Sequence, residues 1–191
     1  MLKNKDNNYN IDKIYDGSSY EYGASYTFLS LARELNLDKM ISTKKNEHTN
    51  NILTMIIGRI LYQGSKLSLV NLYRHSTMWY LAGHDLGKRP DVDKDCYTAM
   101  DFLLTRKSKI ESTLAKKHLT NGNLVLYDIT NIWLEGDYNN SEIAEYGKSK
   151  DGKKGFKIIS IGLLTNEFGC PVGVDVFKGN TSDQTTVLGH Y

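Results

Sequence analysis

The chain has 191 residues, of which 40% are hydrophobic and 24% are charged, and its formal net charge is +2. This length suffices for one good core, or for a core with a helical appendage, and the small net charge leaves only local basic patches as contacts for nucleic acid. No apolar run reaches the ~20 residues of a membrane span, and the polar N-terminus lacks the apolar segment of a signal peptide. Cys96 and Cys170 stand far apart in no metal-ligand spacing, which fits a reducing compartment. We therefore expect a cytoplasmic protein with no membrane partner.

The first part of the chain carries helical periodicity. After a polar lead-in over residues 1–20, apolar residues recur three or four positions apart, which places them on one face of a helix. The clearest sets are Phe28, Leu31, Ala32 and Leu35, and then Ile52, Met55, Ile56 and Ile60. A third helix is expected from about Lys66 to Leu81, and a glycine-containing loop over 82–93 separates it from two more helices. Residues 21–120 are thus predicted to form a helical module.

Within this module, the segment 52–81 is the best candidate for a helix-turn-helix. Two helices joined by a short break such as Gly64-Ser65 can read DNA, although such pairs are more often plain helical hairpins. The polar positions that could contact DNA are Arg59, Lys66, Arg74 and His75. The sequence alone leaves both interpretations open.

Residues 121–191 are predicted to form a sheet. The run Leu124–Thr130 is rich in strand-forming residues, follows the turn signal Asn121-Gly122-Asn123, and is expected to be a buried strand. Two later apolar runs, 156–164 and 171–177, pair naturally as an antiparallel hairpin through 166–169. The expected fold class is therefore α+β, with the helical module followed by mainly antiparallel strands.

Asp128 lies near the end of the first of these strands. Alternation in an extended strand places it on one face with Leu124, Leu126 and Thr130. A carboxylate in such apolar company is costly to bury as an anion unless it is paired or bound to a cation. The structural alternative is an aspartate just past the buried part of the strand, hydrogen-bonded to local backbone.

A lysine-rich segment follows. Five lysines fall within ten residues, with glycines between them: Lys148, Lys150, Lys153, Lys154 and Lys157. Glycine lets the backbone approach a phosphate closely and lysine neutralises it, so this lysine segment is a candidate DNA clamp. A solvated hairpin loop is the competing interpretation.

Several blocks occur in one order along the second half of the chain. They are Leu-Val-Leu-Tyr-Asp-Ile-Thr at 124–130, Glu-Gly at 135–136, Tyr-Gly-Lys-Ser-Lys-Asp-Gly-Lys-Lys-Gly at 146–155, Ile-Gly-Leu-Leu at 161–164, Gly-Cys-Pro-Val at 169–172 and Gly-Asn-Thr-Ser-Asp at 179–183. Together they resemble the DDE-type transposases of bacterial insertion sequences, in the broad IS-four-like group with a ribonuclease-H-like catalytic core. The resemblance is strong from about Asn121 onward and weaker over about 22–118.

This resemblance implies a role for Asp128. In the family, the acid at the end of the matching strand is the first of three ligands for divalent metal ions, so Asp128 would be catalytic and would bind magnesium. The two later acids of the family lie beyond the block that matches 179–183. We therefore expect a truncated ribonuclease-H-like core over 121–191 that is inactive by itself. Nearby acids are expected to be structural rather than substitutes: Glu135, Asp137, Glu142, Asp175 and Asp183.

The resemblance also implies a function. The family moves insertion sequences by metal-dependent DNA cleavage and strand transfer at element ends, as homodimers within a nucleoid-associated complex, and its N-terminal helices serve end recognition or dimerisation. An alternative from another class is a non-catalytic DNA-binding or dimerising remnant, acting as a repressor or without function. A weaker alternative is an unrelated small nuclease with a complete site.

Overall fold

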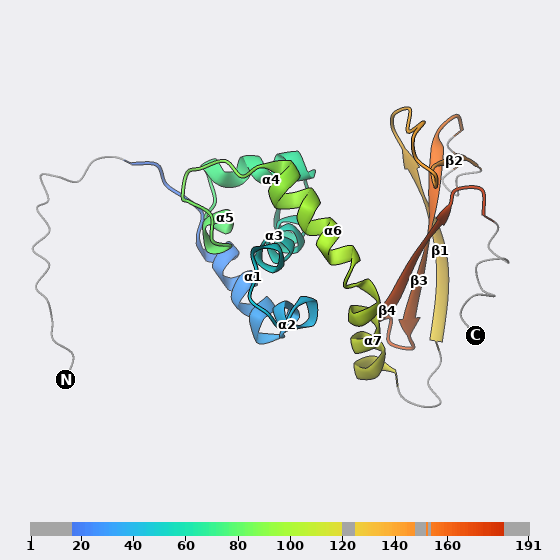
Figure 1. Cartoon of the computed structure of the whole chain (residues 1–191), viewed down its shortest axis with the longest axis horizontal. Helices are drawn as coiled ribbons and strands as arrows, with labels where there is room; N and C mark the ends of the chain where they lie inside the picture. Colours follow the sequence, from blue (N-terminus) through green and yellow to red (C-terminus); the bar gives the residue numbers. More distant parts are fainter. Residues whose placement is uncertain (1–16, 120–124, 148–151, 153, 182–191) are drawn as a thin grey trace, which may run out of the picture. The chain divides into compact units, whose positions relative to one another are not determined.

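The structure, a computed structural model, describes residues 17–119, 125–147, 152 and 154–181. The chain divides into two compact units, residues 1–105 and 106–191 (Figure 1). The division falls earlier than the boundary after residue 120 that the sequence suggests. The reason is that the last helix, α7 (Lys107–His118), bonds to the sheet that follows it.

The helical unit is built around one long central helix. Its elements are α1 (Gly23–Glu34), α2 (Leu37–Ile41), α3 (Glu47–Tyr62), α4 (Lys66–Asn71), the 3-10 turn η2 (Leu72–Arg74), α5 (Met78–Leu81), the π-helical segment η3 (Val92–Tyr97) and α6 (Thr98–Leu104). Helix α3 is capped by Asn46, whose side-chain oxygen accepts a hydrogen bond from Thr49 N at 2.8 Å. Ile52 and Leu53 of α3 are almost fully buried, as are Val70 and Trp79. Of the predicted stripes, Ala32, Ile52 and Met55 are buried. Four other members, Leu31, Leu35, Ile56 and Ile60, are between 41% and 55% exposed, so the stripes pack on one another only in part.

The prediction of a single helix from Lys66 to Leu81 is wrong. The chain instead forms α4, η2 and α5, and it breaks at Ser76 and Thr77. There the backbone pairs with Glu21: Glu21 N donates to His75 O at 2.7 Å and Thr77 N donates to Glu21 O at 2.8 Å. Backbone groups bonded to a distant segment cannot continue a helical ladder, so this tertiary contact overrides the local helical pattern.

The second unit is an open antiparallel sheet with one helix, which confirms the α+β class (Figure 1). Its strands are β1 (Val125–Leu134), β2 (Glu145–Tyr146), β3 (Lys157–Asn166) and β4 (Pro171–Lys178). Strand β3 is central: β1 pairs along its whole length on one side, and β2 and β4 pair with it in succession on the other. The predicted hairpin of the last two strands is confirmed. Its turn is held by Asn166, whose side-chain oxygen accepts hydrogen bonds from the backbone N–H groups of Phe168 and Cys170.

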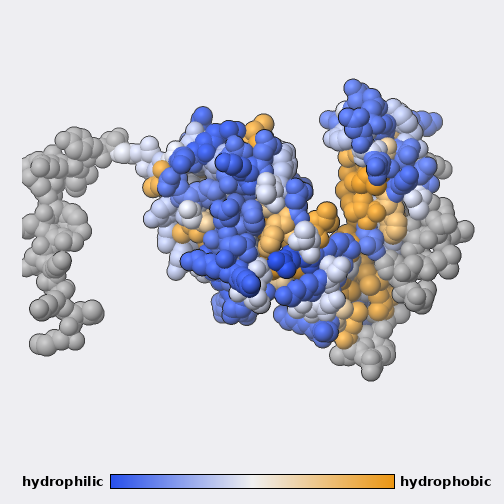
Figure 2. Space-filling view, in the orientation of Figure 1, coloured by the Kyte–Doolittle hydropathy of each residue, from blue (hydrophilic) through white to orange (hydrophobic). Residues whose placement is uncertain are grey.

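The sheet has two unlike faces. On one, which we call the helix face, Ile129, Ile158 and Val172 are at most 7% exposed. The other, the open face, carries a row of exposed side chains: Leu126, Asp128, Thr130, Ile132, Leu163, Val174 and Val176. The expectation that 124–130 is a buried strand is therefore wrong for this face. Figure 2 shows apolar side chains gathered along the strands.

No helix within the described ranges is long and apolar enough to cross a membrane.

Candidate carboxylate site and nucleic-acid interface

Asp128 lies on the open face, in the middle of β1. Its direct partner across the sheet is Leu163 of β3, and its side chain is exposed. One carboxylate oxygen, Oδ1, accepts a hydrogen bond from the backbone N–H of the next residue, Ile129, at 2.9 Å. Because water reaches the group, its charge carries no large burial cost. The local hydrogen bond is of the kind that the structural alternative anticipates.

The surroundings of Asp128 do not complete a magnesium site. Its nearest neighbours on the open face are Leu126 and Thr130 along β1 and Leu163 across the sheet, and none of these carries a carboxylate. Within the part of the chain that the structure describes, no group of three or more His, Cys, Asp or Glu side chains could hold a metal ion. Magnesium needs several oxygen ligands in near-octahedral geometry. The described residues therefore do not fit this metal by themselves.

The other candidate acids are also placed apart from Asp128. Asp175 lies on the helix face, at the register position of Gly162, and bonds to Lys107 of α7 at 3.1 Å. Glu135, Asp137 and Glu142 follow β1 as exposed residues. Asp183 lies outside the described residues. The expectation that these acids do not substitute for missing ligands stays a prediction.

The contacts of Asp175 show what it does instead. Lys107 Nζ lies 3.0 Å from Glu111 Oε1 as well as 3.1 Å from Asp175 Oδ1, and Glu111 Oε1 accepts from Val174 N at 2.9 Å. Burial lowers the pKa of Lys107, but hydrogen bonds and charge attraction from Glu111 and Asp175 outweigh it and raise the pKa above the ordinary lysine value. This ion-pair cluster ties α7 to β4.

A cavity of about 260 Å³ lies between α7 and the helix face. Its walls include Ser112 and Ala115 of α7 and Tyr127, Gly162 and Leu164 of the sheet. Gly162 is required here, because a Cβ atom would collide with the phenol ring and hydroxyl of Tyr127. No periodicity in the sequence indicates such a cavity.

The lysine segment is only partly described. Lys148, Lys150 and Lys153 lie outside the described residues, and Lys154 is exposed. Lys157 is the first residue of β3, and its side chain contacts the segment before this strand. Its Nζ donates to Tyr138 O at 3.1 Å and to Asn139 Oδ1 at 3.2 Å. The same Nζ lies 5.8 Å from the centre of the Tyr146 ring. These contacts give Lys157 a structural role that its place in a charge run does not reveal.

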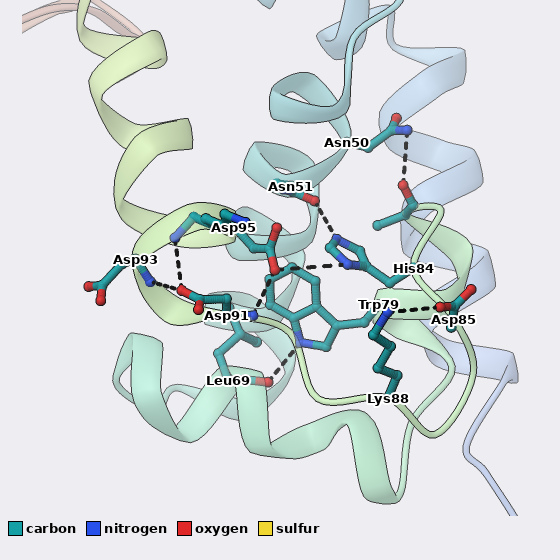
Figure 3. Close-up of polar contacts among 12 residues, drawn as sticks. Asn50, Asn51, Leu69, Trp79, His84, Asp85, Lys88, Asp91, Asp93 and Asp95 are labelled. Carbon is teal, nitrogen blue, oxygen red and sulfur yellow. Dashed lines mark hydrogen bonds and ion pairs between the residues drawn. The ribbon is translucent and has the colours of Figure 1, made fainter.

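A polar cluster in the helical unit was not anticipated from sequence (Figure 3). His84 Nε2 lies 2.8 Å from Asn51 Oδ1, its Nδ1 lies 4.0 Å from Asp95 Oδ2, and its ring meets Trp79 edge-on. Asp95 Oδ2 also accepts from Asp91 N at 2.7 Å, at the start of η3. The cluster joins the 82–91 loop to α3 and η3, so its members are explained by packing.

The helix-turn-helix candidate is present as a local arrangement. Helix α3 ends at Tyr62 and is followed by Gln63, which adopts a left-handed conformation with φ of 52°. Ser65 caps α4 by accepting from Ser68 N at 3.1 Å. The second helix is short, because α4 passes into η2 after Asn71. The candidate cations Arg59 and Arg74 are exposed.

Comparisons with protein-family models, with curated proteins and with solved structures found no match to this chain. The resemblance to transposases therefore rests on the sequence blocks alone.

Proposed function

We propose that this chain is a transposase polypeptide of the DDE type, and that Asp128 is the first of its catalytic carboxylates. The observation that carries the proposal is the place of Asp128. It is exposed on β1, the first strand of an antiparallel meander in the order β1-β3-β4. A ribonuclease-H-like core begins with three antiparallel strands of this kind.

The proposal requires donors that the described residues lack. A single carboxylate cannot hold a pair of divalent ions, so the other acids must come from another segment or another polypeptide. What the described chain supplies is an accessible carboxylate on β1, in a sheet to which α7 bonds through β4. A rigid strand is a suitable support for a site that must be placed accurately.

DNA contact by the lysine segment belongs to the same proposal. Lys150, Lys153 and Lys154 would neutralise backbone phosphates, with little dependence on base sequence. Replacing all three by Ala should weaken binding to a fluorescent duplex and lower the salt slope of the binding constant by about 2.7 units, at about 0.9 for each lost contact. Fluorescence anisotropy at several salt concentrations measures the slope.

A matched control removes the same charge elsewhere. Lys39, Lys44 and Lys45 are exposed lysines of the helical unit, and replacing these three by Ala should leave most of the slope intact. If both triple variants lower the slope equally, the lysine segment is not a specific DNA contact.

The catalytic role proposed for Asp128 must be tested in a transposase that contains all of its catalytic acids. In a transposase that includes the remaining acids, Asp128→Asn should reduce magnesium-dependent strand cleavage at least ~100-fold and leave DNA binding nearly unchanged, because it removes a ligand and little volume. Asp137→Asn, a nearby exposed acid, is the control and should cleave normally. Cleavage by Asp128→Asn at the control rate would show that another carboxylate is responsible.

A non-catalytic DNA-binding or dimerising protein is the second candidate. It is favoured by the apolar neighbours of Asp128 and by the hydrogen bond that Asp128 accepts from Ile129 N. In that case Asp128→Asn changes neither binding nor any cleavage, while the lysine variant still loses affinity.

A further inference from the structure

Helix α7 is attached to the sheet by polar bonds near its two ends. Toward its start, Glu111 Oε1 accepts from Val174 N of β4 at 2.9 Å. At its other end, the backbone carbonyl of His118 accepts from Asn166 Nδ2 at 3.2 Å. None of the 12 residues of α7 is buried. The helix is therefore held at two points without close packing against the strands between them.

The cavity of about 260 Å³ lies along this part of α7. Small residues leave the room for it, because Ser112 and Ala115 line it from one side of the helix and Gly162 and Gly173 line it from the strands. Its apolar and aromatic walls are Leu119, Tyr127, Leu164, Val172 and Val174. An apolar cavity of about 150 Å³ can hold benzene, so this cavity has room for a compact molecule of two fused rings.

The charge along the cavity is negative. Among the described residues that line it, Glu111 and Asp175 carry carboxylates and none carries a cation. Their shared partner, Lys107 Nζ, lies 3.0 Å from Glu111 Oε1 and 3.1 Å from Asp175 Oδ1. One ammonium group beside two carboxylates leaves one negative charge in excess. The two acidic side chains are 24% and 35% exposed, so water screens this charge in part and it favours a cation modestly.

We propose that the cavity under α7 binds a small aromatic amine of up to two fused rings. The ring system displaces water from Leu164 and from the ring of Tyr127, and the burial of its apolar surface supplies most of the affinity. The protonated amino group lies near Glu111 and Asp175, which select it over an anionic ring of the same size. The site is separate from Asp128, which lies on the open face, and it does not depend on the proposed function.

The experiment measures the binding of tryptamine to the full chain, because this probe carries one ammonium group on two fused rings. Titration followed by ligand-observed NMR should give a dissociation constant on the order of 1 mM or tighter, as expected for a ligand of this size. Indole-3-propionate has the same rings and the opposite charge, and it should bind at least ~3-fold more weakly. Equal binding of the two probes, or no saturable binding of tryptamine, overturns the proposal.

Two variants that fill the cavity locate the site. Ala115→Leu keeps a strong helix former in α7 and occupies the cavity, so tryptamine should bind at least ~10-fold more weakly. Gly173→Ala fills less space and should weaken binding by a smaller factor. It fits without strain, because a Cβ atom at this position meets Leu164 Cβ at 3.7 Å.

Thr113→Leu is the matched control, because it places the same side chain on an exposed position of α7. It should bind tryptamine as the wild-type chain does. Unchanged affinity in Ala115→Leu would place the probe elsewhere and overturn the site. If circular dichroism shows that Ala115→Leu does not fold, Gly173→Ala decides in its place, and unchanged affinity there has the same consequence.

Glu111→Gln tests the choice of a cation. The Gln side chain keeps an oxygen that can accept from Val174 N, so the bond between α7 and β4 is retained while one carboxylate is lost. The preference for tryptamine over indole-3-propionate should fall about threefold. An unchanged preference would show that the carboxylates do not face the amino group, and it overturns the choice of an amine.

Discussion

The two units bury their apolar residues in different ways. In the helical unit, Leu53, Val70, Cys96 and Ala99 form a core with 0% exposure, although Ile56 and Ile60 of α3 are 41% and 55% exposed. In the sheet unit, the helix face buries Ile129 and Ile158, whereas the open face leaves Leu126, Ile132, Leu163, Val174 and Val176 between 39% and 50% exposed. The helical unit therefore buries a core between its own helices, whereas the sheet unit leaves a row of apolar side chains exposed on one face.

This difference gives the two units different kinds of surface. A helical unit with a buried core can carry charges on its surface at little cost. An open apolar sheet face with one carboxylate is a surface on which further structure can pack or a partner can bind. Three measurements can break or sharpen this comparison.

Thiol labelling should show the largest difference, because each unit holds one free cysteine. Cys96 has 0% exposure, and burial, helped by the charge of Asp95, raises the pKa of its thiol to about 11. Cys170 is half-buried in the β3–β4 turn. At about pH 8, Cys170 should react with a thiol reagent at least ~100-fold faster than Cys96, which needs both opening and deprotonation.

Mass spectrometry of the labelled chain assigns each rate, and the denatured chain provides the control, since both thiols then react freely. Equal rates in the folded chain would mean that the helical unit opens as readily as the turn.

A matched pair of substitutions tests the two sheet faces. Ile158 on the helix face is 1% exposed and Ile132 on the open face is 44% exposed. Ile158→Ala should cost about 2–4 kcal/mol of the free energy of unfolding, because it leaves a cavity, and Ile132→Ala should cost less than about 1 kcal/mol. Hydrogen exchange of β3 amides measures both. A cost at Ile132 equal to that at Ile158 would show that the open face is covered in solution.

The smallest effect concerns Glu21, which ties the start of α1 to Ser76. Burial raises the pKa of Glu21, but hydrogen bonds from Ser25, Ala24 and Ser76 outweigh burial and lower the pKa below the ordinary value of 4.5. A lowered folded-state pKa means that the stabilisation is present above about pH 4.5 and is lost as the pH falls through the folded value. Glu21→Gln should cost about 1 kcal/mol at neutral pH.

Thermal unfolding of the helical unit at pH values from about 3 to 7 checks this prediction. The difference between the wild-type chain and Glu21→Gln should shrink toward acid. Glu34→Gln on the exposed end of α1 serves as the control and should show a constant small difference. A difference that does not change with pH would remove Glu21 from the acid response.

The sequence predicted the elements better than their limits and partners. The helices α1 and α3 and the β3–β4 hairpin follow from residue periodicity, because local spacing decides which side chains share a face. Spacing did not predict that Leu31, Leu35, Ile56 and Ile60 of the two stripes are exposed. The helix expected over 66–81 failed because a bond to Glu21, far away in sequence, competes for the same backbone groups. Asp128 was correctly placed on a strand beside Leu126 and Thr130, but its exposure could not be predicted, since alternation does not say which face a helix will cover.

What the sequence by itself determined is the order of helices before strands, the antiparallel hairpin, and the absence of acids between Glu47 and Asp85. These are properties of neighbouring residues and of composition. Only the tertiary structure decided that α7 bonds to β4, that Lys107 bridges Glu111 and Asp175, and that Lys157 bonds to Tyr138 and Asn139. Apart from the i, i+4 pair of Lys107 and Glu111, these contacts join residues far apart along the chain, and their free energy exists only once the intervening segments have packed.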